Sequence, residues 1–101
     1  MATIKLFKSD RKDKRFKVVL GDGSVVHFGS PEHQNFTIHK DEGRKRLYII
    51  RHSANENWND IRTAGFWSKH LLWNKPTLSQ SIRDIEHTFG IQIINKISQD
   101  K

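Results

Sequence analysis

Apolar and polar residues alternate along the N-terminal third of the chain. The alternation covers residues 3–7, 15–20 and 24–28, and Gly21-Asp22-Gly23 separates the last two runs. A period of two predicts strands with one buried face, and a glycine-rich turn between two such runs predicts a hairpin. Residues 1–30 are therefore expected to form an antiparallel β-hairpin or a three-stranded meander.

The pattern changes to helical spacing from Thr37 onward. A first helix is predicted from Thr37 to about His52 or Ala54, with acidic residues in its first turns and basic residues later, as the helix dipole favours. Its apolar stripe is expected to face the core and its basic stripe the solvent; Leu47, Ile50 and Ala54 form the first, and Lys40, Arg44 and Arg51 the second.

The clearest helix signal follows Pro76. Thr77 and Gln80 have the spacing of a capping box, and Gly90 is placed to end the helix. Apolar residues between them recur on one face, and residues 91–97 then read as a final strand. The predicted core consists of Phe16, Val18, Leu20, Val26, Phe28, Leu47, Ile50, Trp67, Leu71, Ile82, Ile85 and Phe89.

These elements predict an α+β fold in which about three helices follow the N-terminal strands. A chain of 101 residues has the size of one domain. We expect a single domain over residues 1–101, β-rich over 1–30 and helical over 37–90, with a frayed tail at 98–101.

A second helix is predicted over residues 63–73, and it is apolar nearly all round. Such a helix must be buried on more than one side, either at the centre of the core or partly against a partner. Tryptophan is enriched at binding hot spots. Both readings stay open, and the candidate partner-binding residues are Trp58, Phe66, Trp67 and Trp73.

The net charge of +7 is concentrated in two blocks. Residues 1–20 have a net charge of +5 and residues 40–52 a net charge of +3, while the rest of the chain is slightly acidic. An uneven basic field favours an anionic partner, with a merely solvated surface as the alternative. The candidate nucleic-acid-binding residues are Lys12, Lys14, Arg15, Lys17, Lys40, Arg44, Lys45 and Arg51.

Catalytic and metal signals are weak. The chain has no cysteine, no phosphate-binding glycine loop, no apolar run long enough to span a membrane and no signal-peptide core. His39, Asp41, His52 and Glu56 form a loose set, in which Glu56 would share a face with His52 if the helix continued. We expect no enzyme activity, catalytic residue, metal or cofactor; a metal-dependent nuclease is the minor alternative.

A long stretch of the chain nevertheless looks familiar. His39-Lys40-Asp41, Glu56-Asn57-Trp58, Thr63-Ala64-Gly65-Phe66-Trp67-Ser68 and Leu71-Leu72-Trp73-Asn74-Lys75-Pro76-Thr77-Leu78 resemble motifs of a family of small, basic, uncharacterised proteins of nucleocytoplasmic large DNA viruses. The resemblance covers roughly residues 14–95. It departs at His70, where the family pattern leads us to expect an aromatic residue.

This family has no established activity, so the resemblance implies only a context. It implies a viral protein of the host cytoplasm, where viral factories form, with packaging in the virion as a further expectation. The first functional hypothesis is a virion structural or minor capsid component whose partners are viral structural proteins, with oligomers allowed. The alternative is a protein that contacts the phosphates of packaged nucleic acid through residues 5–17 and 40–51.

Overall fold

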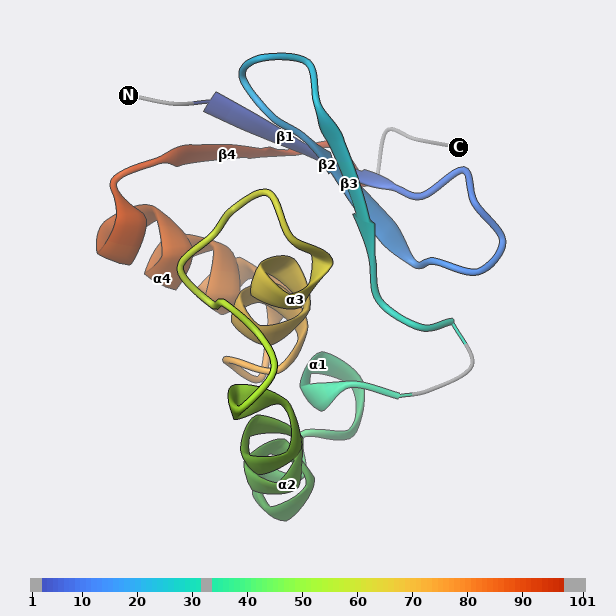
Figure 1. Ribbon diagram of the computed structural model, residues 1–101, viewed down its shortest axis with the longest axis vertical. Helices are drawn as coiled ribbons and strands as arrows, with labels where there is room; N and C mark the ends of the chain where they lie inside the picture. The colour runs from blue at the N-terminus through green and yellow to red at the C-terminus, as the bar shows by residue number, and fades with distance from the viewer. Residues whose placement is uncertain (1–2, 32–33, 98–101) are drawn as a thin grey trace.

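In the computed structural model, which describes residues 3–31 and 34–97, the strands form one mixed sheet in the order β3-β2-β1-β4 (Figure 1). β1 (Thr3–Lys8), β2 (Phe16–Val19) and β3 (Val25–Phe28) pair antiparallel, which confirms the three-stranded meander. β4 (Gln92–Asn95) confirms the final strand and pairs parallel to β1. The last strand thus makes the first one an interior strand.

One face of the sheet is apolar and covered by helices. Ile4 and Leu6 of β1 are fully buried, whereas their neighbours Thr3 and Lys5 are exposed. Ile4 lies opposite Ile93 in the parallel pair, so both join the core. None of Ile4, Leu6 and Ile93 was in the predicted core, because their burial depends on a pairing between the two ends of the chain.

The predicted helix over residues 37–52 is wrong as a single element. It consists of α1 (Phe36–His39) and α2 (Glu42–Ser53), separated by Lys40 in the left-handed region at φ 55°. Each helix has its own N-cap, since the Asn35 side chain accepts from the Thr37 N–H and the Asp41 carboxylate accepts from the Gly43 and Arg44 N–H groups. Short polar side chains offer the backbone such caps, and they outweigh continuous helix here.

The face of α2 that was expected in the core points outward. Leu47 is 51% exposed and Ile50 62% exposed. Tyr48, Ile49 and His52 are partly buried instead, and no residue of α2 is fully buried. Both stripes contain apolar groups, so periodicity alone did not identify the inward one.

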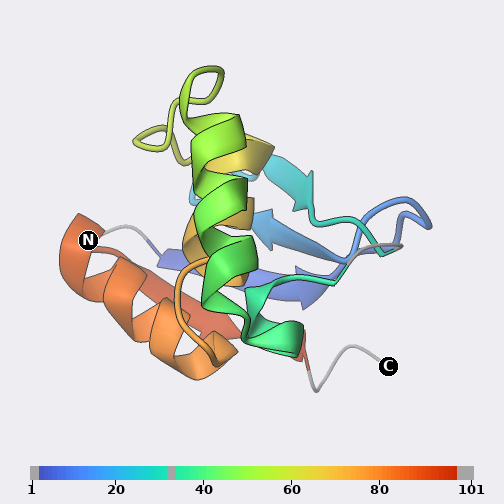
Figure 2. The same ribbon diagram turned by 90° about the horizontal axis from the view of Figure 1, so that it is seen from below.

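The tryptophan-rich helix lies at the centre of the molecule. α3 (Ala64–Trp67) is capped by Thr63 and continues without interruption as a π-helical turn, η1 (Ser68–Leu72). Figures 1 and 2 show it between the sheet on one side and α2 on the other. This position accounts for its all-round apolar character, as the reading of a central core helix requires.

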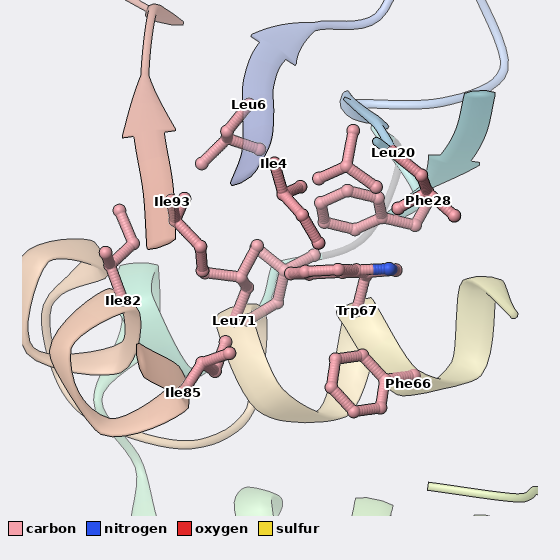
Figure 3. Close-up of a cluster of buried hydrophobic side chains, with 12 residues drawn as sticks. Ile4, Leu6, Leu20, Phe28, Phe66, Trp67, Leu71, Ile82, Ile85 and Ile93 are labelled. Carbon is pink, nitrogen blue, oxygen red and sulfur yellow. The ribbon is translucent and has the colours of Figure 1, made fainter. Parts of the chain in front are cut away.

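The side chains of this central helix fill the core from both sides. Trp67 lies against Phe28 of the sheet, with ring centroids 6.3 Å apart (Figure 3). Phe66 packs edge-on against Phe89 at 5.0 Å. The remaining buried members of the core are Ile4, Leu6, Val18, Leu20, Leu71, Leu72, Ile82, Ile85 and Ile93, and the partly buried Phe16 and Val26 pack against them.

α4 (Leu78–Phe89) forms as predicted. The Thr77 hydroxyl accepts from the Gln80 N–H at 3.2 Å, and Gly90 ends the helix in the left-handed region at φ 66°. Ile82 and Ile85 face the core. The predicted fraying of residues 98–101 lies outside the described residues.

Candidate functional site

A pocket of about 540 Å³ opens between α2, the central helix and the segment that leads from β3 to α1. It is lined by groups from every one of these elements and by one residue of the β1–β2 connection. The lining residues are Lys14, Phe28, Gly29, Ser30, Gln34, Asn35, Arg44, Leu47, Tyr48, Arg51, His52, Glu56, Ala64, Gly65, Ser68, Leu72 and Trp73. Its size is in the range of small-molecule sites, about 300–1,000 Å³.

Stacked rings form one wall of the pocket. The rings of Tyr48 and Trp73 are parallel, with centroids 4.4 Å apart, and His52 stacks on Tyr48 at 4.3 Å. Tyr48 and His52 are four residues apart on α2 and therefore lie on the same face of the helix. His39 of α1 packs against Trp73 at 5.2 Å but does not line the pocket.

The floor of the pocket is built from small residues of the central helix. Ala64, Gly65 and Ser68 line it, with Tyr48 of α2 among the other lining residues. Burial, and then the nearby Glu56 carboxylate, raise the pKa of Tyr48 well above its usual range, and the Ser68 side chain only partly offsets them. The Tyr48 hydroxyl therefore stays protonated and can donate a hydrogen bond.

Glu56 is held at one end of the pocket. Its carboxylate accepts from the Trp58 Nε1–H at 2.8 Å, and its other oxygen lies 3.3 Å from His52 Nδ1. A Cβ built on Gly65 would lie 2.8 Å from the Glu56 carboxyl carbon, so glycine makes room for this carboxylate. Glu56 is thus positioned by contacts with His52 and Trp58 and by the space that Gly65 leaves.

Three cationic side chains line the pocket, and they come from both basic blocks of the sequence. Lys14 lies before β2, while Arg44 and Arg51 lie on α2, with Tyr48 between them on the same face. Among residues 3–31 and 34–97, none of the three forms an ion pair. Among the lining residues in the part of the chain that the structure describes, these three cations face one carboxylate, Glu56, so their local field is positive.

The other predicted nucleic-acid contacts have different surroundings. Arg15 donates to the carbonyls of Ser30 and Pro31, Lys40 donates to the Thr37 carbonyl, and Lys45 lies over the Phe36 ring. Lys17 projects near Asp10 and the Phe7 ring, and Lys12 is exposed between β1 and β2. None of the five lines the pocket.

The predicted partner-binding aromatics also differ in how deeply they are buried. Phe66 and Trp67 are fully buried within the chain, and Trp67 Nε1–H donates to the Ile61 carbonyl at 2.7 Å. Trp58 is partly buried beneath Lys69 and holds Glu56. Trp73 alone of the four lines the pocket. Partner contact is therefore open to Trp58 and Trp73, while Phe66 and Trp67 do not reach the surface.

The loose catalytic set comes together only in part. His52 and Glu56 are in contact, although α2 ends at Ser53 and the chain turns before Glu56. His39 packs against Trp73 and is separated from α2 by the bend at Lys40, and Asp41 serves as a cap. Within the described part of the chain, no group of three or more His, Asp or Glu side chains is arranged to hold a metal ion.

Sequence reasoning missed Tyr48, Ser68 and Gly65 as site residues. One signal was present, because Arg44, Tyr48 and Arg51 are spaced i, i+4 and i+7, which places an aromatic ring between two guanidinium groups on one helix face. No signal in the sequence linked Ser68 or Gly65 to this face. Their contribution depends on how α2 crosses the central helix.

Comparison with known proteins adds little on function. A family model described as a family of unknown function (DUF5754) matches residues 4–52, slightly less than half of the chain. This match includes Lys14, Arg44 and Arg51 but ends before Trp73. No curated protein and no solved structure matches the chain. None of the helices in residues 3–31 and 34–97 has the length and hydrophobicity to cross a membrane.

Proposed function

We propose that the protein binds nucleic acid, with strand phosphates held by Lys14, Arg44 and Arg51 at the pocket. The observation that carries this proposal is the convergence of cations from two separate basic blocks on one aromatic-walled pocket. Arginine presents a planar fork of N–H donors that matches phosphate oxygens. Lysine adds a flexible point charge from the β1–β2 connection.

The arrangement supports binding rather than catalysis. Glu56 is held by His52 and Trp58, and within residues 3–31 and 34–97 no three His, Asp or Glu side chains are arranged to hold the metal ion that a nuclease of this kind would need. Phosphates bound by exposed cations release counterions, and this release makes the affinity depend on salt. The proposed activity is therefore a salt-sensitive association without chemistry on the strand.

Fluorescence anisotropy of a labelled single strand tests the proposal. Replacing both Arg44 and Arg51 by alanine should weaken binding at least tenfold at low salt. It should also lower the slope of log K against log salt by about 1.4, because each lost contact with a single strand contributes about 0.7. Arg46→Ala is the matched control, since Arg46 is an exposed arginine of the same helix that does not line the pocket.

Two outcomes contradict the proposal. The first is an affinity that does not change between low and physiological salt. The second is an equal effect of Arg46→Ala and of either pocket variant, Arg44→Ala or Arg51→Ala, because binding would then follow total charge rather than the pocket.

The virion structural role remains a second prediction. The all-round apolar helix that motivated it has a partner on both sides within the chain. What still supports a protein partner is the exposed apolar stripe of Leu47 and Ile50 on α2. Mass spectrometry of purified particles tests the role, and absence of the protein from them would rule it out.

A further inference from the structure

The pocket has an apolar interior that a phosphate backbone by itself would leave unfilled. Phe28 and Leu72 are buried beneath it, and the rings of Tyr48 and Trp73 form its wall. Gly29, next to β3, leaves room for the Leu72 side chain, because a Cβ at position 29 would lie 3.0 Å from Leu72 Cδ1. A ligand that fits has an anionic part at the rim and a flat, weakly polar part inside.

We infer that the pocket takes in one unstacked nucleobase of the strand whose phosphates lie on Lys14, Arg44 and Arg51. This inference rests on the proposed function and names the form of nucleic acid that the site prefers. Trp73 and His52 already cover the two faces of the Tyr48 ring, so the base is held by apolar contact with the interior and by hydrogen bonds rather than by stacking on Tyr48. In a duplex the bases are paired and stacked, so the protein selects single strands or strand ends.

The polar groups of the pocket suit the edge of a base. Ser68 on the floor and Gln34 and Asn35 on the wall offer hydrogen-bonding groups, and the Tyr48 hydroxyl stays protonated. Glu56 can still accept from an amino group of a base. A carboxylate has about four lone-pair sites, and His52 and Trp58 occupy two of them.

Glu56 also argues against an acidic peptide as the occupant. A peptide that inserted an apolar side chain would bring its neighbouring carboxylates close to the pocket carboxylate, and like charges repel. A nucleotide keeps its charge on the phosphate, at the cationic rim, and presents an uncharged base to Glu56. The separation of the three cations from Glu56 therefore matches the separation of the phosphate from the base in a nucleotide.

Binding of three ligands of matched sequence tests the inference. These are a single strand of about 12 nucleotides, the duplex of that strand, and the same sugar-phosphate strand without bases. The wild-type protein should bind the intact strand roughly tenfold or more tightly than either of the others. Ala64→Leu, which adds bulk to the pocket and removes no charge, should reduce intact-strand affinity to the level of the strand without bases.

Ala54→Leu is the matched control, because Ala54 is an exposed alanine at the end of α2 outside the pocket. It should leave all three affinities unchanged. Should Ala64→Leu fail to fold, quenching of tryptophan fluorescence in the wild-type protein replaces it. Adenosine monophosphate should then quench, and ribose 5-phosphate should not.

Equal affinity for the intact strand, the duplex and the strand without bases overturns the inference but leaves the proposed function standing. Equal weakening of all three by Ala64→Leu does the same. A poly-glutamate peptide containing phenylalanine can also be tested as a competitor. If it displaces the strand at a lower concentration than adenosine monophosphate does, the pocket belongs to an acidic protein and the inference is overturned. No binding of any strand contradicts the proposed function itself.

Discussion

The indole ring of Trp73 lies flat on the phenol ring of Tyr48, with the centroids 4.4 Å apart and the planes inclined by 2°. This contact joins the outermost helix, α2, to the end of the central helix. Since α2 has no fully buried residue, the stack is a large part of what holds it in place. The wall of the pocket and the attachment of α2 are therefore the same pair of rings.

Removing the Tyr48 ring should loosen α2 without unfolding the sheet. We expect Tyr48→Ala to lower the local stability of α2 by about 1–3 kcal/mol, because both the buried area and the ring pairing are lost. Amide hydrogen exchange should accelerate over residues 42–53 and stay slow in β1 and β2. Tyr48→Phe is the control, since it keeps the ring; equal acceleration in both variants would contradict the prediction.

The close approach of Gly65 to Glu56 predicts that the effect of Gly65→Ala on the free energy of unfolding depends on whether Glu56 is present. Gly65→Ala should destabilise the protein by about 1–2 kcal/mol, because its Cβ displaces a carboxylate that accepts from Trp58. In a Glu56→Ala background the same change should be neutral or stabilising by up to about 1 kcal/mol, since alanine favours helix over glycine.

Urea denaturation of the four proteins in this cycle measures the coupling between the two positions. Additive effects, with no difference between the backgrounds, would show that the approach of Gly65 to Glu56 has no energetic consequence.

The buried side chain of His70 predicts a dependence of stability on pH. It is buried at 8% exposure between Phe66 and Phe89, and its Nε2–H donates to the Trp58 carbonyl. Burial lowers the pKa of His70 below its ordinary value of 6.5. The unfolded chain therefore binds a proton more readily than the folded protein does.

It follows that this contribution to stability is complete above pH 6.5 and is lost as the pH falls below that value. Burial also lowers the pKa of His39, which adds a dependence of the same sign. The free energy of unfolding, measured between about pH 7.5 and pH 5, should vary less in His70→Phe than in the wild type. An unchanged slope would show that His70 is not the group responsible.

The outward position of Leu47 and Ile50 predicts tolerance to polar replacement. Leu47→Gln and Ile50→Gln should each change the free energy of unfolding by less than about 0.5 kcal/mol, as is usual for exposed sites. Leu71→Ala, at a fully buried position of the central helix, should cost about 2–5 kcal/mol. Thermal denaturation compares the three variants. A large loss of stability in either glutamine variant would show that the face of α2 with Leu47 and Ile50 is buried.

The sequence by itself determined the elements whose signals are local. The alternation in residues 3–28 predicts the meander, and the Thr77 cap, the apolar stripe through Ile82 and Ile85 and the Gly90 terminus predict α4. Capping and periodicity act within a few residues of each other, so they can be read from neighbours along the chain. The two basic blocks and the tryptophan segment were also visible there, but as separate features.

Only the tertiary structure decided how these features meet. α2 has two stripes with apolar groups. The ring of Trp73, the residue that follows the central helix, stacks on Tyr48 and so fixes the stripe of Tyr48 as the inward one. That orientation leaves Leu47 and Ile50 outside and brings Arg44 and Arg51 to the same pocket as Lys14. A helical wheel defines which residues share a face, whereas the orientation of that face depends on packing against residues distant in sequence.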